Sequence, residues 1–254
     1  MKEKWRLLIT ENNSAYTNMA IDRAVLTTSK EKKIPPTVRF YTWSPPAISI
    51  GYFQSLEEEV DLSVCNDLGI DYVRRITGGG AVFHDKELTY SIVIPENHSE
   101  IPKNIIQSYG RICGAIIKGL NYLGIESQYA PINDIITNGK KISGNAQTRK
   151  EKTVLQHGTV LIDVDVDSMF SLLKVPNEKI KDKLIKDVKQ RVTSINKILK
   201  KDIHFLKAAE AMKMGFEKEF NIELVEGKLT NEEIELTKEF ETQLFSTKKW
   251  NHKR

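Results

Sequence analysis

The sequence has few cysteines and no long hydrophobic run. Its 254 residues include only two cysteines, Cys65 and Cys113, and their spacing fits neither a metal site nor a disulfide framework. The longest apolar runs are much shorter than a membrane-spanning helix requires. Residues 1–6 lack the apolar core of a signal peptide. We therefore expect a cytoplasmic protein that has no membrane partner.

The charged residues do not concentrate in one basic stretch. The formal net charge is +4, from 38 Lys and Arg against 34 Asp and Glu. Nucleic-acid-binding proteins usually carry a concentrated basic stripe, so we expect no nucleic acid partner and a slight bias towards acidic partners. Glycine is also sparse, at 14 residues, which makes a run of three glycines informative.

The three consecutive glycines follow two arginines and precede a His-Asp pair, between stretches that read as strands. The segment is Arg74-Arg75-Ile76-Thr77-Gly78-Gly79-Gly80-Ala81-Val82-Phe83-His84-Asp85. Glycine lets backbone N–H groups converge on an anion, and arginine keeps its charge at any physiological pH. The segment therefore predicts a cradle for phosphate or carboxylate, and the alternative is a plain glycine-rich loop. It is neither a P-loop nor a dinucleotide-binding turn, because no helix follows it.

Hydrophobic periodicity predicts strands in the middle of the chain and helices at its end. The expected strands are 5–10, 38–42, 47–51, 70–73, 81–83, 88–94, an Asn-Gly hairpin within 133–147, and 153–163. The expected helices are 14–25, 56–68, 104–123, 165–173, 177–186, 203–218 and 230–244. This order predicts the α+β class, with a mainly antiparallel or mixed β-sheet flanked by helices. We expect one domain over residues 1–254, with residues from about 200 to 254 as its helical end.

Polar residues outside the glycine segment are also candidates for chemistry. Strict alternation would put Lys141, Ser143 and Asn145 on one face of the hairpin strand and Gly144 and Ala146 on the other. Small residues there favour the close approach of a ligand, although a lone lysine usually lies at the surface.

The histidines and the other polar pairs leave alternatives open. His84-Asp85 and His157 are either acid/base groups or satisfied structural groups, and the structural interpretation is favoured. Asn133-Asp134 either binds a divalent cation or forms a turn. Both cysteines lie on apolar helix faces and are expected to be buried free thiols.

In combination, these segments resemble the lipoate–protein ligase family, which is related to octanoyltransferases and biotin–protein ligases. The resemblance runs from about residue 5 to about residue 200 and is carried by residues 74–85, 133–135, 139–147 and 155–158. It implies the biotin/lipoate ligase catalytic-domain fold. It also implies an enzyme that uses ATP and Mg²⁺ to convert lipoate to lipoyl-AMP, and then passes the lipoyl group to a lysine of an acceptor protein.

The resemblance also assigns the site. Lys141 corresponds to the catalytic lysine of the family, whose cation would stabilise charge that develops on the phosphate and the acyl carbonyl. Asn133, Asp134 and Lys141 are expected to bind nucleotide and Mg²⁺, with Asp134 as the metal ligand. Tyr41, Phe53 and Val82 are candidates for the wall of an apolar tunnel. The expected contacts to lipoate or lipoyl-AMP are Arg75, Gly78, Gly79, Gly80, Ala81, Val82, His84, Ser143, Gly144, Asn145, Ala146, His157 and Gly158.

The main alternative is an octanoyltransferase that moves an octanoyl group from acyl carrier protein to the acceptor lysine. Segments 33–41 and 85–91 look more like those enzymes. However, the region 127–137, where such an enzyme would carry a nucleophilic cysteine, contains none. We therefore expect a ligase. A non-catalytic lipoyl-binding accessory subunit is a third hypothesis.

The expected partners are lipoyl-acceptor domains, namely the glycine cleavage H protein and the E2 subunits of 2-oxoacid dehydrogenases. A separate small accessory-domain protein is a further expected partner, because residues 245–254 are too few for a second core. That tail is basic with one large aromatic residue, Trp250. It is expected to be a frayed terminus, and docking through Trp250 is the alternative.

Overall fold

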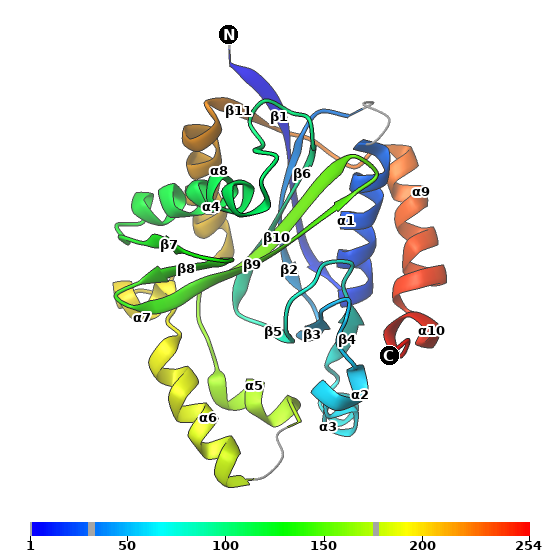
Figure 1. The fold of residues 1–254 in the computed structure, drawn as a ribbon, viewed down its shortest axis with the longest axis vertical. Coiled ribbons are helices and arrows are strands. Elements are labelled where there is room, and N and C mark those ends of the chain that lie inside the picture. Colours follow the sequence, from blue (N-terminus) through cyan, green and yellow to red (C-terminus); the bar gives the residue numbers. More distant parts are fainter. Residues whose placement is uncertain (1, 30–33, 175–177) are drawn as a thin grey trace.

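The computed structural model describes residues 2–29, 34–174 and 178–254 and is organised around an eight-stranded mixed sheet (Figure 1). The strand order is β11-β1-β2-β6-β10-β9-β8-β7. The pairs β1–β2 and β1–β11 are parallel and the other neighbours are antiparallel, which confirms the predicted fold class. The strands are β1 (Glu3–Asn13), β2 (Thr37–Trp43), β6 (Glu87–Pro95), β7 (Gln128–Ala130), β8 (Asp134–Thr137), β9 (Lys140–Lys150), β10 (Thr153–Leu161) and β11 (Ile222–Glu226).

A smaller sheet carries the glycine segment. In it β3 (Ala47–Ile50) pairs parallel with β4 (Asp71–Arg74) and antiparallel with β5 (Val82–His84). Residues 75–81 connect β4 to β5, so the glycines join strand to strand as predicted. Gly51, directly after β3, packs against this connection, and a Cβ at Gly51 would lie 2.0 Å from the carbonyl oxygen of Gly79. A side chain at residue 51 would therefore push the glycine segment away.

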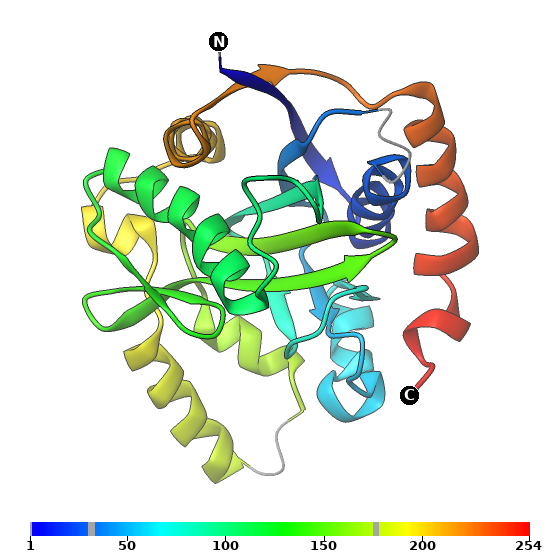
Figure 2. The ribbon, with the colours of Figure 1, turned by 45° about the horizontal axis from the view of Figure 1, so that its top comes forward.

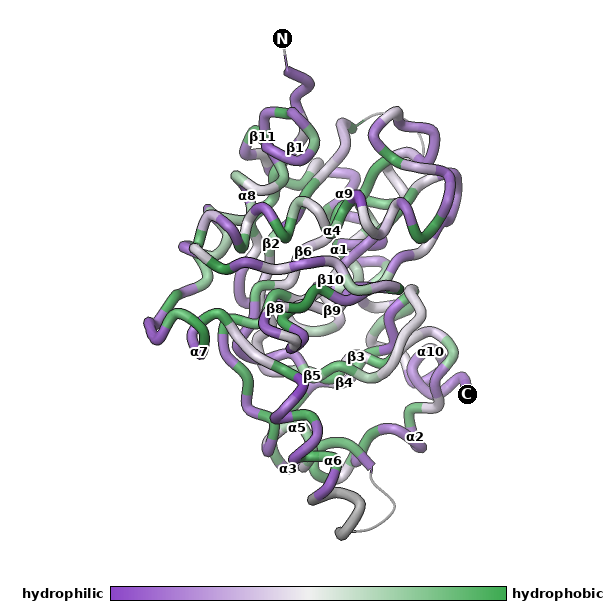
Figure 3. The backbone as a smooth tube through the Cα atoms, turned by 60° about the vertical axis from the view of Figure 1, so that its left-hand side comes forward, coloured by the Kyte–Doolittle hydropathy of each residue, from purple (hydrophilic) through white to green (hydrophobic). Residues whose placement is uncertain are grey.

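Alternation along the central strand β6 separates two hydrophobic cores. Leu88, Tyr90 and Ile92 belong to the first core, which α4 (Ile105–Tyr122) and α8 (Phe205–Phe220) cover. Val93 belongs to the second core, beneath α1 (Ala15–Ser29). In both ribbon views α9 (Asn231–Phe240) lies alongside α1 (Figures 1 and 2). Hydrophobic stretches of β3 and β10 run through the interior (Figure 3).

The remaining helices are short, apart from α6. The predicted helix over 56–68 is wrong in one respect, because it is interrupted between α2 (Leu56–Glu59) and α3 (Leu62–Asp67). The side chain of Asp61 accepts hydrogen bonds from the backbone N–H groups of Ser63 and Val64 and so starts a new helix. Among the described residues no helix is both long and apolar enough to cross a bilayer. These elements are α2 (Leu56–Glu59), α3 (Leu62–Asp67), α5 (Val166–Leu172), α6 (Glu178–Arg191), α7 (Ile195–Leu199), the π-helical turn η1 (Glu241–Phe245) and α10 (Lys248–Asn251).

The C-terminal residues are docked on the small sheet, so the expectation of a frayed terminus is wrong. Arg74 ends β4 and is fully buried. Its guanidinium donates to the carbonyl groups of Gly51, Trp250 and Asn251, among others. The side-chain oxygen of Asn251 accepts a hydrogen bond from the backbone N–H of Arg74 at 2.7 Å. Arg74 thus joins the loop after β3 to α10, and both lie beside the glycine segment.

Removal of the Asn251 side chain should destabilise the fold. The Asn251→Ala variant leaves the buried N–H of Arg74 without its acceptor, and a buried unsatisfied donor costs about 1–3 kcal/mol. Urea denaturation followed by circular dichroism measures this loss. The matched control is Lys249→Ala, an exposed position of the same helix, where we expect a change within about 0.5 kcal/mol. Equal unfolding midpoints for the two variants would show that the contact contributes nothing.

Candidate active site

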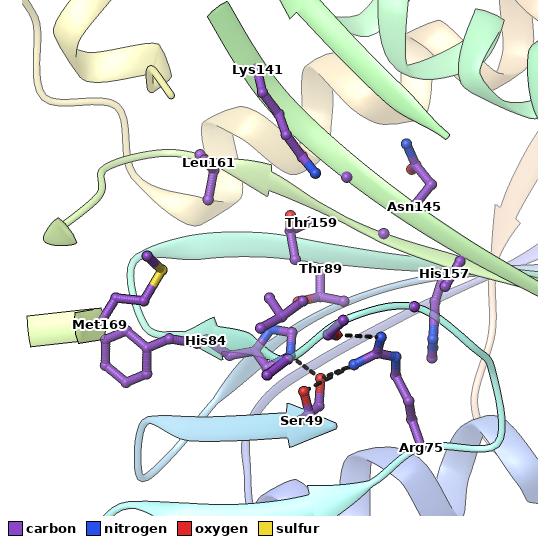
Figure 4. A pocket seen from close by; sticks show the side chains of 18 of the residues that line it. Ser49, Arg75, His84, Thr89, Lys141, Asn145, His157, Thr159, Leu161 and Met169 are labelled. Carbon is purple, nitrogen blue, oxygen red and sulfur yellow. Dashed lines mark hydrogen bonds between the residues drawn. The ribbon is translucent and has the colours of Figure 1, made fainter. Parts of the chain in front are cut away.

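The glycine segment and strand β9 border a cavity of about 330 Å³, which is within the range of small-molecule sites. Lys141 lies at one end of it, and Arg75, Ser49 and His84 lie at the other (Figure 4). Two of the expected contact residues, Gly78 and Ser143, are not part of its wall. The expected residues that line it are Arg75, Gly79, Gly80, Ala81, Val82, His84, Asn133, Lys141, Gly144, Asn145, Ala146, His157 and Gly158.

Much of the remaining wall is apolar and comes from elements that sequence analysis did not connect with the site. Tyr41 and Val82 line the cavity as expected, whereas Phe53 is 67% exposed and lies outside it. Met19 in α1, Val188 in α6 and Val192 just after α6 carry no local sequence signal that they line one cavity. The apolar residues that were missed are Met19, Trp43, Phe83, Leu161, Val164, Met169, Val188 and Val192.

Lys141 points into the cavity because the hairpin contains a β-bulge. Lys141 and Ser143 pair with consecutive residues of β8, so Ile142 is the extra residue. The bulge reverses the alternation, and Lys141 shares a face with Gly144. A Cβ at Gly144 would lie 2.7 Å from Cε of Lys141. The prediction that Gly144 lies on the opposite face is therefore wrong, and the glycine leaves room for the lysine.

The ammonium of Lys141 is paired with the carboxylate of Asp134 at the open end of the cavity. Nζ is 2.7 Å from Oδ1, and the two side chains are 41% and 35% exposed. Asn133 holds β8 and β9 together nearby, because its Nδ2 donates to the carbonyl of Asn145 at 2.6 Å. Ion pairs this exposed contribute little to stability. Lys141 can therefore exchange Asp134 for the oxygen of a ligand at little cost.

Arg75 shapes the glycine segment from within. Its guanidinium donates to the carbonyl groups of Gly78 and Gly80 and to the carbonyl and hydroxyl oxygens of Ser49. All four acceptors are uncharged, and the side chain is buried. Burial lowers the pKa of Arg75 to about 10, so it stays protonated at neutral pH. The predicted cradle has arginine beside it, but the arginine donors already bind the protein's own backbone.

At the deep end, His84 connects a hydroxyl to a carboxylate. Its Nε2 is 2.7 Å from Ser49 Oγ and its Nδ1 is 2.6 Å from Glu87 Oε1. The carboxylate that His84 contacts is that of Glu87, on β6. Asp85, the next residue after His84, takes no part in this series of hydrogen bonds. This connectivity is that of a nucleophile–base–acid triad. However, Ser49 is only 1% exposed, and its hydroxyl already accepts a hydrogen bond from Arg75. We therefore assign a structural role to the hydrogen-bonded residues Ser49, His84 and Glu87, which support Arg75 and the floor of the cavity.

His157 links α1 to the glycine segment through a buried network. Its Nε2 is 2.7 Å from Thr77 Oγ1 and its Nδ1 is 3.4 Å from Asp22 Oδ2. Burial lowers the pKa of His157, and Asp22 only partly offsets this effect. Burial alone would raise the pKa of Asp22, but the hydrogen bond with His157 and the charge of Arg39 lower it overall. A neutral histidine beside an ionised aspartate suits the structural interpretation.

The two cysteines lie in hydrophobic cores, as predicted, and neither belongs to the cavity wall. Burial raises the pKa of Cys65 to about 11 and that of Cys113 to about 12. Thiols with such pKa values are inert near neutral pH. Among the described residues no group of three or more His, Cys, Asp or Glu side chains is placed to hold a metal ion. Asp134 contacts Lys141, and its role as a Mg²⁺ ligand stays a prediction.

Comparison with known proteins identifies relatives over the whole chain. Residues 14–217 match the model of the lipoyl protein ligase A/B catalytic domain. The octanoyltransferase LipM of Geobacillus kaustophilus (strain HTA426) is 39% identical, and the alignment covers 100% of this chain and 99% of the relative. The octanoyltransferase LipM of Clostridioides difficile (strain 630) is 38% identical, with 99% of each chain covered.

Solved structures of ligases are also similar to this chain. A bi-partite lipoate protein ligase from Thermoplasma acidophilum is 31% identical with a TM-score of 0.89, over 98% of this chain and 96% of that one. A lipoate-protein ligase A bound with ATP is 29% identical with a TM-score of 0.84, over 99% of both chains. These matches confirm the predicted fold type.

The curated relatives correct the expected activity. They are octanoyltransferases, 33% to 39% identical over nearly their full length, so the expectation of an ATP-dependent lipoate ligase is wrong and the alternative is favoured. The prediction of a ligase rested on the lack of a cysteine in region 127–137, and this feature is therefore no mark of ligase chemistry. The expectations of ATP as a cofactor and of a separate accessory-domain protein as a partner depended on the same interpretation.

Stability should fall as the pH drops below about 6.5, the ordinary pKa of histidine. The folded pKa of His157 is lowered, so the unfolded state binds more protons in this window, and the free energy of unfolding decreases by at most about 1.4 kcal/mol per pH unit for one proton. The folded pKa of Asp22 is also lowered, so Asp22 stabilises the folded state at pH values above about 3.9. This contribution is lost as the pH falls further. Urea denaturation at pH 7.5 and 5.5 should show a smaller decrease for His157→Gln than for the wild type. Identical decreases would contradict a neutral buried His157.

Proposed function

We propose that this chain, which belongs to the lipoyl protein ligase A/B catalytic-domain family, transfers an octanoyl group from a carrier-protein thioester to a lysine of a lipoyl-acceptor domain. The acceptors would be domains such as those of the glycine cleavage H protein and the E2 subunits of 2-oxoacid dehydrogenases. The observation that carries the proposal is the full-length similarity to octanoyltransferases. The reaction moves an acyl group that is already activated, so it needs no nucleotide.

The cavity supports this proposal because it combines an apolar wall with a cation at its open end. An octanoyl chain would lie along Trp43, Met169 and Val188, where each buried methylene contributes about 0.8 kcal/mol to binding. Its carbonyl would then lie near Lys141. Arg75 and the glycines would shape the cavity around the octanoyl group.

The proposed chemistry is direct aminolysis. The amine of the acceptor lysine attacks the thioester carbonyl, so that a C–N bond forms and the C–S bond breaks. The leaving thiolate takes up the proton that the amine loses. Negative charge develops on the carbonyl oxygen in the tetrahedral intermediate, and the ammonium of Lys141 would stabilise it. To do so the ammonium would exchange Asp134, which is 2.7 Å away, for the carbonyl oxygen. Because both cysteines are buried outside the cavity, the proposal includes no acyl-cysteine.

Octanoyl transfer should proceed without any nucleotide. The purified chain is incubated with an octanoyl-carrier protein and a lipoyl-acceptor domain after apyrase has removed residual ATP. Intact mass spectrometry of the acceptor should show the added octanoyl group, and ATP should leave the rate unchanged. If the acceptor were modified only with ATP and a free acid, lipoate or octanoate, the proposed function would be wrong.

Lys141→Ala should reduce the rate of octanoyl transfer by about 10²-fold or more, because it removes a preorganised charge from the transition state. Its free energy of unfolding should change by no more than about 0.5 kcal/mol, as for other partly exposed positions. Lys140→Ala is the matched control, since Lys140 precedes it on β9 and is not part of the cavity wall. Equal rates for the two variants would remove Lys141 from the proposed mechanism.

A further inference from the structure

A cluster of cations and aromatic rings lies on the surface near the glycine segment. We call it the basic aromatic patch. In it the ammonium of Lys253 is 3.2 Å from the ring centroid of Tyr52 and 4.1 Å from that of Trp250. The patch therefore joins the loop after β3, the tip of the β9–β10 hairpin and the C-terminal residues. Its members are Tyr52, Phe53, Lys150, Trp250, Lys253 and Arg254.

The positive charges of the patch crowd one another. Lys150 approaches the same Tyr52 ring, with 5.3 Å from Nζ to the centroid, and Arg254 lies 5.3 Å from the centroid of Phe53. Burial lowers the pKa of Lys253 to about 8, and the neighbouring cations contribute to this shift. Like charges held together destabilise the folded state. An anionic partner would relieve this repulsion.

Phe53 gives the patch an apolar centre. Its side chain is 67% exposed, while its ring packs edge-on against Tyr52 at 5.0 Å between centroids. One exposed aromatic residue is ordinary. Exposed aromatic rings together with arginine, however, are the composition of binding hot spots. The patch thus combines apolar contact with positive charge, as expected for a surface that docks an acidic protein.

The position of the patch selects which partner fits. Tyr52 follows Gly51, which packs against Gly79 of the cavity wall, and the N–H of Tyr52 donates to the carbonyl of Thr77 at 2.8 Å. The patch therefore adjoins the glycine segment. Lys150, in contrast, is nine residues along β9 from Lys141, or roughly 30 Å. A partner docked here must send its reactive group into the cavity on a long arm.

We propose that the basic aromatic patch docks the acyl donor, an acidic carrier protein that holds the octanoyl thioester on a phosphopantetheine arm. This inference rests on the proposed octanoyl transfer. The lysine side chain of an acceptor domain is short, so that domain must lie directly over the open end beside Lys141. A phosphopantetheine arm is long and flexible. From the side of the patch that adjoins the glycine segment, where Tyr52 donates to the carbonyl of Thr77, it can pass into the cavity. Donor and acceptor then occupy different surfaces.

Charge reversal within the patch tests the proposal with two donors. The double variant Lys150→Glu/Lys253→Glu should raise KM for the octanoyl-carrier protein about tenfold and weaken its dependence on salt. KM for octanoyl-pantetheine, which lacks the protein, and KM for the acceptor domain should stay unchanged. The control is Lys218→Glu/Lys238→Glu, an equal change of charge at exposed positions of α8 and α9. Thermal denaturation confirms that both variants are folded.

Direct binding separates this proposal from the proposed function. Calorimetry measures the binding of the octanoyl-carrier protein to the Lys141→Ala variant. The Kd should be about tenfold higher when this variant also carries Lys150→Glu and Lys253→Glu. Binding that depends on the patch, without any transfer by the wild type, would retain the docking surface and reject the transfer. Docking would be rejected if the carrier did not bind, if its Kd were unchanged by the reversal, or if the reversal raised KM only for the acceptor domain.

Discussion

The cavity depends on the buried guanidinium of Arg75. Four hydrogen bonds from this group fix the carbonyl groups of Gly78, Gly80 and Ser49, as well as the Ser49 hydroxyl. They hold the glycine segment in a curve around the cavity. Desolvation is costly for a buried cation that binds only neutral acceptors. The position of the Arg75 guanidinium is therefore sensitive to every neighbouring group. The supporting groups around it, His84 at one side and His157 at the other, are correspondingly well packed and hydrogen bonded.

These supports connect distant parts of the chain to one site. His84 ties β5 to Glu87 on β6, and His157 ties β10 to Asp22 on α1 and Thr77 in the glycine segment. Arg74, next to Arg75, ties the same region to residues 250 and 251. The reactive end is built differently, because Lys141 and Asp134 are partly exposed and form an exchangeable pair. A rigid floor and an adaptable opening suit a reaction in which two large partners exchange one acyl group.

Sequence periodicity was sufficient where local rules decide the structure. The Asn-Gly hairpin and the glycine segment between strands were predicted, since turn chemistry and strand alternation act locally. The prediction of which residues share a face with Lys141 was wrong, because one extra residue, Ile142, reverses the alternation. Bulges carry no clear sequence signal. The apolar wall and the docked tail were missed because both are tertiary contacts between residues far apart in sequence. The predicted activity was wrong because this chain is similar both to lipoate protein ligases and to octanoyltransferases, so the motifs on which the prediction rested do not distinguish the two reactions.

The most direct measurement is a crystal structure with an analogue of octanoyl-pantetheine in which an amide replaces the thioester. We expect the alkyl chain to occupy the cavity along Trp43, Met169 and Val188, and the carbonyl oxygen to lie within hydrogen-bonding distance of Lys141 Nζ. A carbonyl placed at the deep end, against Ser49 and His84, or an alkyl chain bound outside this cavity, would contradict this expectation.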